Sequence, residues 1–105
     1  MQPSQVQEAA RPKLQGKMVR PYEQTQEGNK IHRRFPHNVE DDELMWHTDA
    51  ANRRVTIIES NGWKLQMDNM LPVILDVGSV HNISKDTWHR LHKGNGDLVI
   101  LIEEF

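Results

Sequence analysis

The stretch Arg53-Arg-Val-Thr-Ile-Ile-Glu-Ser-Asn-Gly-Trp-Lys-Leu-Gln-Met67 decides the fold class. Its first part, Arg53–Glu59, is rich in β-branched residues. Its last part, Trp63–Met67, alternates apolar and polar side chains with the period of a half-buried strand. Asn61-Gly62 lies between the two parts and is the strongest short signal of a β-hairpin. We therefore predict two strands joined by this turn, with Trp63 on the core face.

Further short apolar segments flank this stretch on both sides. Upstream we predict a strand at 44–48, and downstream strands at 71–75, 80–83, 87–91 and 97–103. Turn signals separate them, and Gly94-Asn95-Gly96 is a second hairpin signal. The last segment is apolar at every interior position, so we expect it to be covered on both faces. About seven evenly spaced strands without a helical pattern predict an all-β barrel or sandwich.

Length and composition limit the classes of function. A chain of 105 residues suits a single domain, and a net charge of −2 argues against a nucleic-acid partner. The chain has no cysteine, which excludes disulfides and thiolate metal sites. We find no signal-peptide pattern, and no apolar run approaches the roughly 18–20 residues that span a membrane. We therefore expect a soluble, cytoplasmic protein without a membrane partner.

The N-terminal part of the chain differs from the rest. Residues 1–30 are rich in Gln, Glu, Lys and Pro and contain one aromatic residue, Tyr22. Such a segment buries too little apolar surface to offset its ordering entropy. We predict an irregular arm at 1–35 and a barrel at 36–105. Two interpretations of the arm stay open: a disordered tail, or a segment that orders on a partner subunit through Met18, Val19 and Tyr22.

Two motif-like stretches carry a family resemblance. The first is Trp46-His-Thr-Asp49, and the second runs from Gly78 to His89 eleven residues later. Their spacing resembles the paired motifs of the cupin superfamily, and residues 43–104 resemble short cupin-like proteins of tailed phages and marine bacteria. The resemblance implies a small cupin-type β-barrel, or double-stranded β-helix. Because so small a barrel buries little surface alone, we also expect a homodimer.

The motifs depart from the superfamily pattern at the metal ligands. Asp49 stands where the second histidine is usual, and Arg53 or Arg54 stands where a glutamate is usual. His47 and Asp49 are two residues apart, so on a strand they share a face. With His89 they form two imidazoles and one carboxylate, a set that can hold Fe, Mn, Ni or Zn. The alternative is a degenerate site in which Asp49 pairs with an arginine and the histidines are hydrogen-bonded.

Three functions stay open on this basis. The first is a small-molecule-binding barrel, with or without a metal. Candidate residues line its mouth: Arg53, Arg54, Gln66 and His81. The second is a metal-dependent oxygenase or isomerase that uses His47, Asp49 and His89 as ligands. The third is a structural or assembly component of a phage particle, which would place the protein in the host cytoplasm or the virion.

Overall fold

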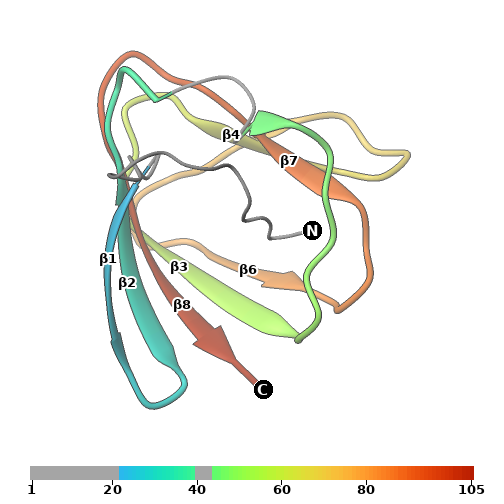
Figure 1. Ribbon diagram of the computed structural model, residues 1–105. Coiled ribbons are helices and arrows are strands. Elements are labelled where there is room, and N and C mark those ends of the chain that lie inside the picture. Colours follow the sequence, from blue (N-terminus) through green and yellow to red (C-terminus); the bar gives the residue numbers. More distant parts are fainter. Residues whose placement is uncertain (1–21, 40–43) are drawn as a thin grey trace, which may run out of the picture.

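The computed structural model of the protein describes residues 22–39 and 44–105, and within them it contains eight strands (Figure 1). They form two antiparallel sheets, a five-stranded sheet in the order β1-β2-β8-β3-β6 and a three-stranded sheet in the order β5-β4-β7. The all-β prediction is confirmed. The strands are β1 (Glu23–Glu27), β2 (Lys30–Phe35), β3 (Arg53–Glu59), β4 (Lys64–Met67), β5 (Val73–Ile74), β6 (Val80–Ile83), β7 (His89–His92) and β8 (Leu98–Glu104).

The core lies between the inner faces of the two sheets. Strand pleating sends alternate side chains inward, and β8 contributes Leu98, Ile100 and Ile102 in this way. Trp63 is fully buried, as predicted, and its indole N–H donates to the carbonyl of Gly96 at 2.7 Å. A buried indole needs such a partner, so this bond holds the bulkiest core side chain in one orientation.

Strand β8 lies in the middle of the larger sheet, between β2 and β3. Its inner face carries Ile102, which is 2% exposed, and its outer face carries Val99, which is 3% exposed. The expectation that this strand is covered on both faces is therefore confirmed for these positions. Its continuous apolar sequence follows from this central place in the sheet.

Both predicted hairpins are wrong, because each turn connects one sheet to the other. Asn61 and Gly62 adopt the left-handed backbone (φ 59° and 84°) that the Asn-Gly signal requires. However, β3 pairs with β6 and β8, whereas β4 pairs with β5 and β7. The two turns pack against each other instead. The Asn95 N–H donates to the Asn61 carbonyl at 3.0 Å, and the Asn61 amide donates to the Asp97 carbonyl at 2.8 Å.

The predicted boundary of the barrel at residue 36 is also wrong. Residues 23–35 form the hairpin of β1 and β2, and β2 pairs with β8 from Lys30–Glu103 to Phe35–Leu98. The signal for this hairpin is Gly28-Asn29, with Gly28 at a φ of 61°. The polar sequence of β1 hid it, since that strand buries none of its side chains fully. Residues 1–21 lie outside the described residues, so the prediction for the rest of the arm stays open.

The segment before β3 is less regular than predicted. Instead of a strand at 44–48 it forms an isolated bridge between His47 and His89. Strand β5 is a two-residue strand at the end of its sheet, which fits the predicted edge position of the segment with Pro72. Among the residues described, no helix is long and apolar enough to cross a membrane.

Candidate metal centre

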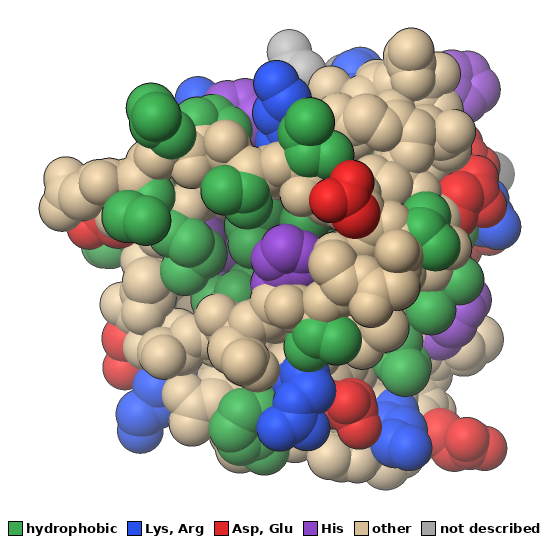
Figure 2. Space-filling model, turned by 180° about the vertical axis from the view of Figure 1, so that it is seen from behind, with side chains coloured by type: hydrophobic (Ala, Val, Ile, Leu, Met, Phe, Trp, Pro, Cys, Tyr) green, Lys and Arg blue, Asp and Glu red, His purple; other side chains and the backbone are tan. Residues whose placement is uncertain are grey.

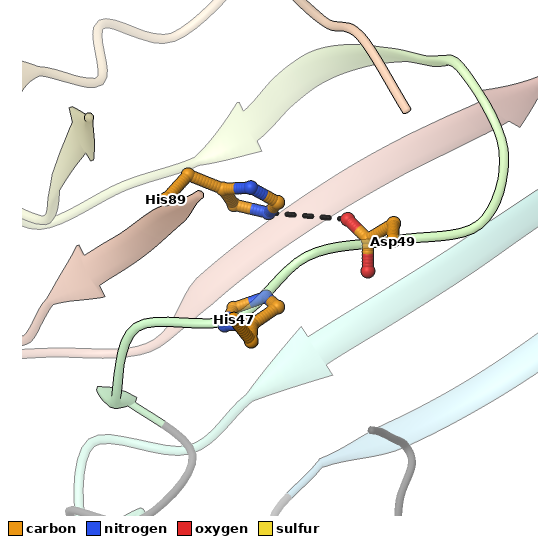
Figure 3. Close-up of side chains that lie close together, drawn as sticks. All are labelled: His47, Asp49 and His89. Carbon is orange, nitrogen blue, oxygen red and sulfur yellow. Dashed lines mark ion pairs between the residues drawn. The ribbon is translucent and has the colours of Figure 1, made fainter. Parts of the chain in front are cut away.

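Two backbone hydrogen bonds bring the motif residues together inside the barrel. The His47 N–H donates to the His89 carbonyl and the His89 N–H donates to the His47 carbonyl, each at 3.0 Å. This pairing sets the two side chains opposite each other, with ring centroids 4.4 Å apart. Asp49, two residues after His47, is on the same side (Figure 3). The carbonyl of Asp49 accepts from the Asp86 N–H at 2.8 Å, which holds the segment in place.

The orientation of each imidazole is set by a carbonyl of the chain. His47 Nδ1 lies 2.8 Å from the Met45 carbonyl, and His89 Nδ1 lies 2.8 Å from the Thr87 carbonyl. A carbonyl oxygen only accepts, so we assign the proton of each ring to Nδ1. In the neutral rings both Nε2 atoms then carry a free electron pair. Such a bond to the second ring nitrogen also orients histidine ligands in metal sites.

The ligand atoms of His47, Asp49 and His89 all lie within 4.8 Å of one another. His89 Nε2 is 3.1 Å from Asp49 Oδ2 (Figure 3). Oδ2 is buried, and among the described residues it accepts no hydrogen bond of good geometry. Two electron-pair donors at this distance need a cation between them, either a proton on His89 or a metal ion. The residues therefore fit a metal ion by chemistry and by position.

The pKa shifts of Asp49 and His47 favour the protonation states in which these side chains bind metals. Burial alone raises the pKa of the Asp49 carboxyl, but contact with His89 and the positive charge of Arg53 lower it to about 2. Burial lowers the pKa of His47, and this outweighs the hydrogen bond to the Met45 carbonyl. At neutral pH Asp49 is thus ionised and His47 is neutral, the states in which they bind metals.

Arg53 joins Asp49 to the last strand. Its Nη1 is 3.3 Å from Asp49 Oδ1, while Nε and Nη2 donate to Glu104 Oε2 at 3.0 and 2.8 Å. The predicted pairing of Asp49 with an arginine is therefore present. Because Arg53 is shared between two carboxylates, the three groups together carry one net negative charge. The arginine accordingly leaves a negative charge for a cation at the site.

The cluster borders a cavity of about 80 Å³. Arg53 and His81, both predicted to line the barrel mouth, lie in its wall. Arg33 lies there too and was not predicted to do so. Arg33 lies in β2, a strand that was not predicted from the sequence. Most of the wall is apolar, so the cavity suits a small molecule with an apolar body. The lining consists of Arg33, Phe35, His47, Asp49, Arg53, Val55, Ile57, Leu65, Leu75, His81, Ile83, His89, Leu91, Ile100 and Ile102.

Arg54 and Gln66 lie outside this cavity, contrary to the prediction. Arg54 is next to Arg53 and therefore faces outward, where its guanidinium lies 3.9 Å from Glu103 and over the Phe105 ring. Gln66 follows the inward-facing Leu65, and its amide oxygen is 2.8 Å from His92 Nε2 on the outer face of β4 and β7. The alternation of apolar and polar residues along Trp63–Met67 already indicated that Gln66 faces away from the core.

Comparisons with known proteins place the chain by its fold. No protein-family model matches it, and no curated protein matches its sequence. A solved cupin domain from Bordetella pertussis is similar, with a TM-score of 0.57 and 19% identity over 85% of this chain and 99% of the other. The chain has the cupin fold. A solved protein from Neisseria meningitidis is also similar, with a TM-score of 0.58 and 17% identity over 85% of this chain and 88% of that protein.

The chain also resembles part of a larger enzyme. HppE, solved with Fe(II) and an alternative substrate, matches with a TM-score of 0.58 and 15% identity. The match covers 72% of this chain and 41% of HppE, so the chain spans less than half of the enzyme's length. At these identities the likeness concerns the fold alone.

Proposed function

We propose that this cupin binds a divalent metal ion through His47 Nε2, the Asp49 carboxylate and His89 Nε2. One observation carries the proposal. Both histidines use Nδ1 on backbone carbonyls, which leaves two Nε2 electron pairs beside a buried carboxylate oxygen without a hydrogen bond among the described residues. A competing ion pair between a protonated His89 and Asp49 uses the same atoms, and the experiment below separates the two.

The ligand set indicates which metals to test. Two imidazoles and one carboxylate suit Fe(II), Mn(II), Ni(II) and Zn(II), and in a three-residue set further coordination positions stay open. Bound there, the metal would serve as a Lewis acid or as an oxygen-activating centre. HppE, a protein of the same fold, was solved with Fe(II).

Groups of the chain itself orient the proposed metal ligands and bound the space for a substrate. The carbonyls of Met45 and Thr87 orient the two imidazoles. Arg53 pairs with the Asp49 carboxylate, and its positive charge opposes that of a bound cation. The cavity measures about 80 Å³, which limits the substrate to a small molecule. We therefore propose, as the activity of the metal-loaded form, an oxygenase-type or isomerase-type reaction on a small molecule.

Metal content and titration test the proposal. Protein purified without an affinity tag is analysed by inductively coupled plasma mass spectrometry. After chelation it is titrated calorimetrically with each of the four ions, with Fe(II) under anaerobic conditions. We expect one ion per chain in the wild type and at least about 100-fold weaker binding in His47→Gln, Asp49→Asn and His89→Gln.

The matched control is His92→Gln, since His92 lies on the outer face of β7, outside the ligand cluster. Circular dichroism shows whether each variant is folded. A wild type that takes up none of the four ions contradicts the proposal and leaves the His89–Asp49 ion pair as the account of the cluster. Equal binding by Asp49→Asn and the wild type also contradicts it.

A further inference from the structure

An arginine side chain faces the inside of the barrel. On strand β2, Ile31 and Phe35 point into the core and are each 4% exposed, and Arg33 lies between them on the same face. Its side chain lines the cavity that the candidate metal centre borders. Charged side chains seldom turn toward an apolar interior, because removing a charge from water costs free energy. An anionic group inside the cavity would offset this cost.

Two neighbouring side chains hold the guanidinium of Arg33 in place. Gln24 of β1 pairs directly with Arg33 across the two strands, and its amide oxygen accepts from the Arg33 Nε–H at 2.9 Å. The guanidinium also lies over the ring of Tyr22, with its central carbon 4.1 Å from the ring centroid. Gln24 and Tyr22 are neutral, so they orient the guanidinium without neutralising its charge. A group oriented in this way loses little freedom when it binds an anion.

The charged groups of the cavity wall differ in their roles. The described wall contains two arginines, Arg33 and Arg53, and one carboxylate, Asp49. Asp49 belongs to the proposed metal ligands, and Arg53 pairs with Asp49 and with Glu104. Arg33 is thus the charged group of this wall that takes no part in the metal cluster. Its positive charge gives the cavity a second polar point besides the proposed metal.

The rest of the wall suits a short apolar chain. Most of its residues are apolar, and one of them, Ile100, pairs with Arg33 in the register of β2 and β8. Figure 2 shows a hollow in the surface that is bordered by hydrophobic side chains with a histidine beside it, a composition like that of the cavity wall. The cavity volume of about 80 Å³ admits only a small molecule.

We infer that the cavity binds a small organic acid, whose carboxylate is held by the Arg33 guanidinium and whose short apolar chain contacts the aliphatic wall. The planar guanidinium matches a carboxylate, since two parallel N–H···O bonds can join them. The single negative charge of a carboxylate also balances the single positive charge of Arg33. The inference names the substrate class of the proposed function and rests on that function for the reaction, whereas binding of the acid itself does not require the metal.

Titration of the full, metal-free chain with butyrate, followed by nitrogen–proton NMR correlation spectra, tests this inference. Butyramide is the matched ligand control, because it has nearly the same size and shape without the charge. We expect butyrate to bind at least about tenfold more tightly than butyramide. We expect Arg33→Gln to weaken butyrate binding at least about tenfold, and Arg33→Lys to weaken it less, because lysine keeps the charge but not the planar fork.

The matched protein control is Arg34→Gln, because Arg34 is the next residue along β2 and faces outward, where it pairs with Asp97 at 2.8 Å. This variant should bind butyrate like the wild type, and the spectra show whether each variant is folded. One readout does not depend on any variant. In the wild type, the Nε–H signal of Arg33 should shift when butyrate is added and stay in place when butyramide is added.

The same titrations are repeated after loading with Zn(II), which separates this inference from the proposed function. Butyrate binding to a wild type that takes up no metal supports the inference and contradicts the proposed metal site. Equal affinity for butyrate in Arg33→Gln and the wild type, with or without metal, places the carboxylate elsewhere and overturns the inference. A wild type that binds no butyrate in either state, or binds butyramide equally well, overturns it too.

Discussion

His89 Nε2 lies 3.1 Å from Asp49 Oδ2, and the two side chains are only 6% and 14% exposed. The residues belong to different segments and meet because the backbone of His47 pairs with that of His89. Since Nδ1 of His89 lies at hydrogen-bond distance from the Thr87 carbonyl, it is Nε2 that faces the Asp49 carboxylate. This relationship links metal binding, acid stability and the role of Arg53.

The first prediction concerns stability in acid. The pKa of Asp49 is lowered in the folded protein from 3.8 to about 2, so its ionisation stabilises the fold above the unfolded value and this contribution is lost as the pH falls through about 2. In metal-free protein, we expect the difference in unfolding free energy between wild type and Asp49→Asn to shrink by about 2 kcal/mol between pH ~5 and pH ~2. Urea unfolding at each pH measures it.

The control for this prediction is Asp68→Asn, at an exposed carboxylate. A difference between wild type and Asp49→Asn that stays constant over the whole pH range would show that the ionisation of Asp49 does not stabilise the fold.

The second prediction separates the two neighbouring arginines. Arg53→Met removes the positive charge beside Asp49 and leaves Glu104 without its partner. We expect the metal-free protein to lose about 1–3 kcal/mol of stability and the metal to bind about tenfold more tightly, because less positive charge opposes the cation. Urea unfolding and calorimetric titration measure the two effects.

Arg54→Met is the matched control, because Arg54 faces outward and is half exposed. It should change stability by less than about 0.5 kcal/mol and leave metal affinity unchanged. If Arg53→Met bound the metal no better than Arg54→Met, the charge of Arg53 would not act on the site.

The third prediction concerns the packed turns that connect the sheets. A Cβ added at Gly94 would overlap the Asn61 carbonyl oxygen and approach the Trp63 backbone nitrogen to 2.7 Å. Backbone atoms cannot move aside as a side chain does, so we expect Gly94→Ala to destabilise the fold by about 1–3 kcal/mol or more. Thermal and urea unfolding measure the loss. Asn95→Ala, at the exposed neighbour, should stay within about 0.5 kcal/mol of wild type, and a Gly94→Ala variant as stable as Asn95→Ala would refute the predicted clash.

Side-chain periodicity correctly predicted the strands whose own sequence is β-branched, apolar or alternating. The bounds of Arg53–Glu59 and Val80–Ile83 match β3 and β6, and Trp63 is in the core. The strands β1 and β2 escaped prediction because β2 has only Ile31 and Phe35 as buried residues among charged ones. Pairing with β8 makes that segment a strand, and pairing between distant segments leaves no local pattern.

The sequence by itself determined local conformation and the faces of strands. It placed a left-handed turn at Asn61-Gly62, and it placed His47 and Asp49 two residues apart, on one side of the chain. It wrongly predicted that the strands on either side of each Asn-Gly-type turn pair with each other, and it left open whether Arg53 or Arg54 faces the site. Only the tertiary structure decided these points and brought His89 to Asp49, because they depend on strand pairing across the barrel, whereas neighbouring residues determine only backbone angles and the alternation of side chains.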